Sequence, residues 1–201
     1  MHTLKEGIPL DEPKKKHDIK EAAKLLFQEF GFSHVTMEEI ALRANASKGT
    51  LYKYFPDKLS VYEDLLKEIR EKERVHIQEI IESDLVFTKK IEQIIETRVE
   101  MYMETKSHFF QDPVLYSDEM KSYMSENRVE IKRLRERLYE TGRSEGMICE
   151  DISNQTLELY FDSIHLGLSQ KYQTLSNIPK NELRKFLKVV YGGLLACKVG
   201  M

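Results

Sequence analysis

The chain has 201 residues and a net charge of −3, with 41% hydrophobic and 32% charged residues. This hydrophobic share supplies a core and excludes wholesale disorder, while five prolines and nine glycines leave little room for a turn-rich β fold. No apolar run approaches the length of a membrane span, no secretory leader pattern is visible, and Cys149 and Cys197 form no disulfide framework. We therefore expect a cytoplasmic protein with reduced thiols and no membrane partner.

The charge is unevenly distributed along the chain. Residues 14–70 carry 11 Lys and Arg against 9 Asp and Glu, a local excess of two positive charges in an acidic protein. Lys14, Lys15 and Lys16 precede the first expected helix. Such a distribution is compatible with a nucleic-acid partner, although a solvated charge pattern explains it equally well.

Residues 1–13 lack periodicity and are expected to form a flexible arm. Apolar residues at helical spacing then predict a helix that ends at Gly31. Thr36 with Glu39 forms a capping box, which predicts the start of a short second helix. Asn45 and Ala46 are expected to make a turn, and Ser47 to cap a third short helix that Pro56 ends.

The remainder of the chain predicts helix after helix and no strands. Asp57 caps a long fourth helix, Thr88 the next, and a short helix over 113–124 precedes a longer one that fades at Gly142 and Gly146. Ser153 starts another, and Pro179 separates it from the last. The fold class is thus all-α with about nine helices. We expect a flexible arm (1–13), a three-helix helix-turn-helix DNA-binding domain (14–58), and an effector-binding and dimerisation domain (59–201) whose first helix is a connector.

Two short helices joined by a tight turn suit DNA recognition, because one crosses the backbone and the other enters the major groove. A helix N-terminus presents free amides, and a glycine beside it permits close approach to phosphate or base. Lysine donates to guanine in the major groove, and tyrosine hydroxyls suit phosphates. The candidate DNA-binding residues are Thr36, Ser47, Lys48, Gly49, Thr50, Tyr52, Lys53, Tyr54 and Lys58.

These residues resemble the helix-turn-helix of the TetR family. The resemblance rests on Thr36-x-x-Glu-Ile-Ala, on the run from Ala46 to Phe55 (ASKGTLYKYF) and on Lys58. It extends from about Ile19 to Leu66, and beyond that only the helical layout is similar. It implies a homodimer that binds a near-palindromic operator in double-stranded DNA, a small-molecule effector in the C-terminal body, and dimerisation through the last two helices. Lys53 and Leu59 depart from the residues common in the family.

Some of these positions have a second explanation. Thr36 and Ser47 are helix caps with or without a phosphate contact. Tyr54 suits packing against the first helix as well as it suits a phosphate. Lys48 and Lys58 suit an ordinary charged surface as well as a DNA contact. Lys14–Lys16 form either a solvated helix start or an arm for the minor groove.

The second half of the chain is rich in aromatic and sulfur-containing residues, which suit an adaptable apolar pocket but also an ordinary core. Arg98 and His165 are the polar positions among them, and pairing with a neighbouring carboxylate is the alternative explanation for each. The candidate effector-pocket residues are Arg98, Met101, Tyr102, Phe109, Phe110, Tyr116, Tyr123, Tyr160, Phe161 and His165.

Glycines in the last two helices predict a dimer interface, because small residues allow helices to cross closely. The candidate interface residues are Gly167, Leu168, Phe186, Val190, Gly193 and Leu194. Glu158, Asp162 and His165 are spaced as weak metal ligands, but we expect no metal and no cofactor.

The chain has no GxGxxG, P-loop, HExxH or nucleophile motif, so we do not expect an enzyme. The leading hypothesis is a sequence-specific transcriptional regulator, a repressor released by a small, largely apolar effector. The alternative is a helical interaction protein that retains a helix-turn-helix without specific operator binding. A DNA-binding assay separates the two.

Overall fold

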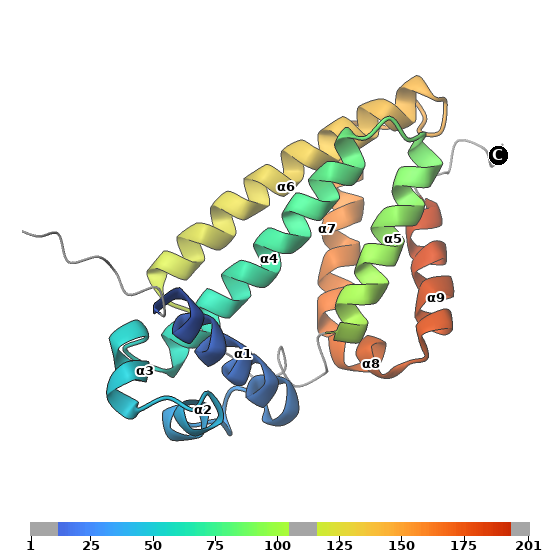
Figure 1. The fold of residues 1–201 in the computed structure, drawn as a ribbon. Helices are drawn as coiled ribbons and strands as arrows, with labels where there is room; N and C mark the ends of the chain where they lie inside the picture. The colour runs from blue at the N-terminus through green and yellow to red at the C-terminus, as the bar shows by residue number, and fades with distance from the viewer. Residues whose placement is uncertain (1–11, 105–115, 194–201) are drawn as a thin grey trace, which may run out of the picture. The chain divides into compact units, whose positions relative to one another are not determined.

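The computed structural model describes residues 12–104 and 116–193, and within these ranges every regular element is a helix (Figure 1). This confirms the all-α prediction and the count of about nine helices. None of the described helices is both long enough and apolar enough to cross a bilayer. The helices are α1 (Glu12–Phe30), α2 (Met37–Arg43), α3 (Lys48–Tyr54), α4 (Lys58–Glu82), α5 (Phe87–Glu104), α6 (Asp118–Ser144), α7 (Asn154–Gln170), α8 (Tyr172–Asn177) and α9 (Lys180–Gly192).

The described residues divide into two compact units, the first ending at Lys67 and the second beginning at Glu68. Helix α4 therefore belongs to both units, because it starts in the first and ends in the second.

The first unit has its own core of side chains from α1 to α4. Ile19, Ile40 and Leu51 are fully buried, one from each of the first three helices. The ring of Phe27 on α1 meets the ring of Tyr62 on α4 edge-on, with 5.6 Å between centroids. Helix α1 ends as its sequence predicts, with Gly31 in the left-handed region (φ 82°) and its amide bonded to the Phe27 carbonyl.

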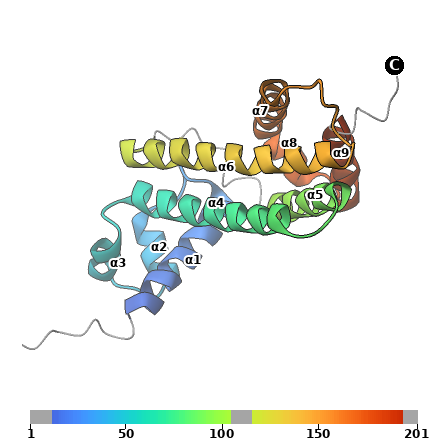
Figure 2. The same ribbon diagram turned by 90° about the horizontal axis from the view of Figure 1, so that it is seen from above.

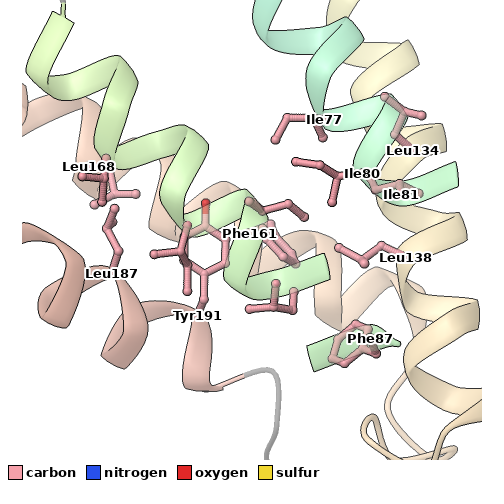
Figure 3. Packing of buried hydrophobic residues seen from close by; sticks show 14 of the residues in the cluster. Ile77, Ile80, Ile81, Phe87, Leu134, Leu138, Phe161, Leu168, Leu187 and Tyr191 are labelled. Atoms are coloured by element: carbon pink, nitrogen blue, oxygen red, sulfur yellow. The ribbon is translucent and has the colours of Figure 1, made fainter. Parts of the chain in front are cut away.

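The second unit is a helical body in which α5 packs against α6, α8 and α9. Figure 2 shows α6 running beside the later part of α4, where Arg137 donates to Glu82 over 2.6 Å. In the core, Ile77, Ile80 and Ile81 of α4 lie close to Leu134 and Leu138 of α6 (Figure 3). The same cluster continues through α7 and α9, so one apolar core holds this unit together.

Two predicted helix starts differ from the structure. Helix α5 begins at Phe87 and not after Thr88, because the carboxylate of Glu145 accepts the Phe87 amide at 2.9 Å. The helix expected over 113–124 and the long helix expected after it form one helix, α6, which runs unbroken from Asp118. Residues 105–115 lie outside the described residues. The apolar stripe of helical spacing from Met124 to Leu138 predicts that Met124 faces inward, but its side chain is exposed.

The expectation of reduced thiols is wrong at Cys149, which is disulfide-bonded. Cys197, the second cysteine of the sequence, lies outside the described residues.

Candidate nucleic-acid interface

Helix α2 starts at the predicted capping box. The Thr36 hydroxyl accepts the Glu39 amide at 3.2 Å, and the Glu39 carboxylate accepts the Thr36 amide at 2.8 Å. These two bonds satisfy amides that the first turn of a helix leaves without partners. Thr36 and Glu39 are thus engaged in holding α2, and the Thr36 side chain remains exposed at its start.

A tight turn connects α2 to α3. Asn45 adopts a left-handed conformation (φ 47°), and the Ala46 amide bonds to the Ala41 carbonyl at 2.9 Å. Asparagine tolerates this conformation better than most residues. The turn is held further by Lys15 of α1, whose ammonium donates to the Asn45 carbonyl at 3.2 Å.

Helix α3 buries one face and exposes the other. Ser47 caps it by accepting the Thr50 amide at 3.0 Å, as predicted. Leu51 and Phe55 anchor the inner face in the core. The outer face carries five exposed residues from the predicted DNA-binding set: Ser47, Lys48, Gly49, Tyr52 and Lys53.

Three other predicted residues are only partly exposed. The Thr50 hydroxyl lies 2.8 Å from that of Ser47. Tyr54 is half-buried, and the ammonium of Lys53 lies 5.9 Å from the centre of its ring. Lys58 donates to the Phe32 carbonyl at 2.6 Å and lies over the Phe32 ring, so its ammonium is engaged within the chain.

Gly49 is open on the side that a side chain would occupy. A Cβ at this position would meet only the Ser47 hydroxyl, at 3.8 Å. The packing of the chain itself therefore does not require a glycine here.

Lys48 has a partner that the sequence analysis missed. Its ammonium lies 2.6 Å from the carboxylate of Glu38, one turn into α2. This hydrogen bond lowers the pKa of Glu38 and raises the pKa of Lys48, so both groups are charged at neutral pH. Both side chains are exposed, and the carboxylate of Glu38 competes with other ligands of Lys48. Glu38 and Lys48 are ten residues apart and lie on different helices, so no short-range sequence pattern indicates that they pair.

The lysines at the start of α1 serve the first unit. Lys20 and Lys16 lie 2.7 and 3.3 Å from the two carboxylate oxygens of Asp64 on α4. Burial alone would raise the pKa of Asp64, but the two lysines outweigh burial and hold the pKa below its ordinary value. Lys16 also lies over the ring of Phe55. Lys14, the first of the three consecutive lysines, is exposed.

Several of the predicted effector-pocket residues lie in or against the core of the second unit. Tyr160 and Phe161 pack into the core of α6, α7 and α9, where Phe161 lies against Tyr139 and Tyr191. Tyr102 of α5 is buried in the same core, and Arg98 lies one turn before it on α5. Met101, Tyr116 and Tyr123 are partly buried, and Phe109 and Phe110 lie outside the described residues.

Arg98 is paired with a carboxylate, the alternative left open above. Its guanidinium forms an ion pair with Glu73 of α4, which also lies 3.3 Å from Arg70. His165, expected to face the core, has an exposed side chain. Partial desolvation of its ring lowers its pKa, and so do the nearby Arg98 and Arg70. The sequence gave no signal for Glu73, because it is one of many charged residues on α4.

The predicted dimer residues do not share one environment. Phe186 is exposed, Gly167 has no atom near its missing Cβ, and Val190 is partly buried. Leu168 is instead buried in the core of its own chain. Gly193 approaches Tyr160, whose hydroxyl donates to the Val190 carbonyl. A larger residue at 193 would therefore collide within the chain, and Leu194 lies outside the described residues.

The weak metal trio is not assembled. No group of three metal-ligating side chains occurs among the described residues. Glu158 is occupied by Arg135, which holds it with two nitrogens, and by the Tyr139 hydroxyl at 2.8 Å.

Comparison with known proteins places this geometry among bacterial regulators. Residues 19–68 match the family model described as bacterial regulatory proteins, tetR family. The HTH-type transcriptional regulator YxbF of Bacillus subtilis is 42% identical over 53 residues, which are 26% of this chain and 14% of that protein. The HTH-type transcriptional repressor KstR2 of Rhodococcus jostii is 28% identical over 142 residues, 69% of this chain and 70% of that protein. The chain thus spans about a seventh of the first relative.

The fold is similar over nearly the whole chain to a solved structure. The fatty acid degradation regulator FadR from Bacillus halodurans matches with a TM-score of 0.70 and 19% identity, covering 95% of this chain and 97% of that one. These relatives are named as transcriptional regulators.

Proposed function

Since the chain belongs to the TetR family of bacterial regulatory proteins and is a DNA-binding transcriptional regulator, we propose that it is a repressor released from its operator by a small effector. The observation that carries the proposal is the exposed face of α3, held at a capped start and a fixed turn. In a helix-turn-helix this face enters the major groove. A bacterial protein that binds DNA must reach the DNA in the cytoplasm, so the proposed partner also supports a cytoplasmic location.

In this proposal Lys48 donates to a guanine edge, with Thr50 and Lys53 on neighbouring bases or phosphates. Gly49 allows the backbone at the start of α3 to approach the DNA, where free amides favour a phosphate. Thr36, Ser47, Tyr52 and Tyr54 contribute phosphate contacts. Lys58 is proposed to add a phosphate contact, beside the hydrogen bond that its ammonium donates to the Phe32 carbonyl.

The second unit is proposed to bind the effector and to form the dimer. Effector binding would favour a dimer in which the two α3 helices are wrongly spaced for successive major grooves, which lie about 34–36 Å apart. A hundredfold change in operator affinity requires about 2.7 kcal/mol of coupling. Two features support this division: the second unit has its own core, and α4 connects it to the first unit.

The test is the loss of sequence discrimination in Lys48→Ala. Purified protein is expected to protect a short palindrome selected from random DNA, with affinity that falls steeply as salt rises. Lys48→Ala should reduce the preference for that palindrome over scrambled DNA by about tenfold or more, since one good base contact contributes about 1–3 kcal/mol. Binding is measured by fluorescence anisotropy of labelled DNA.

Lys14→Ala is the matched control, because Lys14 is also an exposed lysine of the first unit but lies outside the helix-turn-helix. It should lower affinity for both DNAs alike. Equal preference in Lys48→Ala and the unmodified chain would contradict the assignment of Lys48. Weak, sequence-blind binding by the unmodified chain would instead favour the interaction-protein alternative.

A further inference from the structure

An exposed ion pair joins the two helices of the helix-turn-helix. The ammonium of Lys48, the first residue of α3, lies 2.6 Å from Oε1 of Glu38, the second residue of α2. The two side chains are 64% and 56% exposed, so both charged groups face the solvent. The pair therefore presents a hydrogen-bond donor and a hydrogen-bond acceptor side by side, next to the face of α3 that is proposed to meet DNA.

The stability of α2 does not account for the direction of the Glu38 side chain. The capping box at the start of this helix uses Glu39, whose carboxylate accepts the amide and the hydroxyl of Thr36, each at 2.8 Å. Exposed ion pairs contribute little to stability. An acidic residue in the first turn stabilises a helix through the helix dipole, whichever way its side chain points. Stability thus explains an acidic residue at position 38, but not its contact with Lys48.

Both groups of the pair have the capacity to bind a further partner. A lysine ammonium has three N–H donors, and a carboxylate has about four acceptor positions. The contact between them lowers the pKa of Glu38, so its carboxylate is ionised at neutral pH and acts as an acceptor only. The pair therefore suits a partner that offers acceptors to Lys48 and a donor to Glu38.

A guanine–cytosine pair offers this arrangement in the major groove. Guanine presents the acceptors N7 and O6, and cytosine presents its N4 amino group as a donor. Guanine O6 and cytosine N4 are joined by a hydrogen bond of the base pair, so they lie about 2.9 Å apart. The Lys48 ammonium and Glu38 Oε1 are 2.6 Å apart, which is close to that separation. One ion pair thus matches one base pair.

An adenine–thymine pair does not match the ion pair equally well. Its one donor, adenine N6, lies between two acceptors, adenine N7 and thymine O4. A carboxylate that accepts from this donor has a lone-pair atom on each side, and the ammonium reaches one acceptor in place of two. Phosphates offer acceptors only, so a carboxylate beside them finds no donor. The guanine–cytosine pair is the partner that satisfies both charges.

We propose that Glu38 is a specificity-determining residue that reads, together with Lys48, one guanine–cytosine pair in each half of the operator. The inference rests on the proposed function, in which α3 enters the major groove. Lys48 donates to N7 and O6 of the guanine. Glu38 accepts the N4–H of the opposite cytosine that faces the groove.

The experiment changes the protein and the DNA together. The palindrome selected by the unmodified chain is made with N4-methylcytosine at each cytosine in turn, symmetrically in both halves. This base still pairs with guanine, but its methyl group replaces the N–H that faces the major groove. Glu38→Ala is the test variant, and it is expected to fold because position 38 is exposed and alanine is a strong helix former.

Glu29→Ala is the matched control. Glu29 of α1 is 57% exposed and pairs with Arg43 of α2 at 3.9 Å, so this variant also removes an exposed carboxylate that joins two helices of the first unit. Fluorescence anisotropy measures the affinity of the unmodified chain and of both variants for each DNA. The scrambled DNA described above is included for comparison.

One cytosine in each half-site should be sensitive to methylation. Binding there should weaken at least about tenfold for the unmodified chain and for Glu29→Ala, and no more than about threefold for Glu38→Ala, because a hydrogen bond to a charged group is at stake. Glu38→Ala should also prefer the unmethylated palindrome over scrambled DNA less strongly than Glu29→Ala does.

The proposal is overturned if no cytosine shows this difference between the unmodified chain and Glu38→Ala. It is equally overturned if Glu38→Ala keeps the full preference for the palindrome, since the carboxylate would then only compete for Lys48, or if the selected half-sites contain no guanine–cytosine pair. Sequence-blind binding by the unmodified chain would refute this proposal and the proposed function together. A selected palindrome without a sensitive cytosine would refute the role of Glu38 alone.

Discussion

Gly49 and Gly142 both lie within helices, but the space around them differs. A Cβ at Gly142 of α6 would lie 2.7 Å from Ile148 and 2.9 Å from Phe87, whereas a Cβ at Gly49 meets no apolar atom. Neither glycine has a positive φ, so alanine can adopt the backbone conformation at both. The packing of the chain therefore explains Gly142 and leaves Gly49 to be explained by an outside partner.

Gly49→Ala should separate stability from DNA binding. Alanine is the better helix former by up to about 1 kcal/mol, so the free energy of unfolding should stay equal or rise. The added methyl group should weaken binding to the selected palindrome, because it lies where the DNA backbone is proposed to approach. Urea unfolding and anisotropy measure the two effects, and undiminished DNA affinity would remove Gly49 from the interface.

Gly142→Ala should have the opposite pattern. Overpacking a core costs about 1–3 kcal/mol, which exceeds the gain in helix propensity. We expect the free energy of unfolding of the second unit to fall by about 1 kcal/mol or more in urea, with no change in the DNA sequence that is preferred. An unchanged unfolding midpoint would mean that Ile148 and Phe87 move aside freely.

At the scale of elements, the sequence predicted the helix boundaries that depend on contacts between residues close together in the chain. The caps at Thr36, Ser47 and Ser153 were all predicted correctly, because each joins atoms only three residues apart. The start of α5 was not, because its cap is Glu145, 58 residues away along the chain. The exposed face of α3 was predicted for the same local reason, whereas Glu38 and Glu73 as partners of Lys48 and Arg98 depend on how separate helices meet.

Helices α1 and α4 are joined by a charge contact that gives a pH-dependent stability. The pKa of Asp64 is lowered in the folded chain, so its contribution is complete above the ordinary aspartate pKa of about 3.9 and is lost as the pH falls below it. Asp64→Asn should lower the stability of the first unit by about 1 kcal/mol at pH 7, since the pair is partly exposed. Urea unfolding at pH 7 and near pH 3 measures it.

The difference between Asp64→Asn and the unmodified chain should shrink at the lower pH. Asp118→Asn is the control, because Asp118 pairs only with Lys121 on the same exposed helix face. A loss of stability that is equal at both pH values would show that Asp64 acts through packing and not through its charge.

At the scale of the whole molecule, the described residues include apolar side chains without cover on α7 and α9. Leu159, Leu166, Phe186 and Val189 are exposed, Val189 to 79%. Exposed apolar residues on neighbouring elements are typical of protein interfaces. They support the proposed dimer better than Gly193 does, because Gly193 is already close to Tyr160 of its own chain.

Val189→Asp should therefore raise the monomer fraction. If position 189 is buried in the dimer, an unpaired carboxylate there makes association less favourable by several kcal/mol, because it loses water and gains no cationic partner. Sedimentation equilibrium at several concentrations measures the association constant. Val129→Asp on α6 is the control, because Val129 is also exposed but lies on a different helix. If both variants remain as dimeric as the unmodified chain, the interface lies elsewhere.

The contact between Lys48 and Glu38 has a kinetic consequence. On a chain that reads DNA with Lys48, every encounter with a phosphate or base must first compete with a carboxylate already in place. That competition weakens binding to all sequences alike and shortens the time spent on each wrong site. Under the proposed function, only a site that supplies further contacts to α3 would offset the loss, and Glu38 would speed the search for the operator by making the protein leave other DNA sooner.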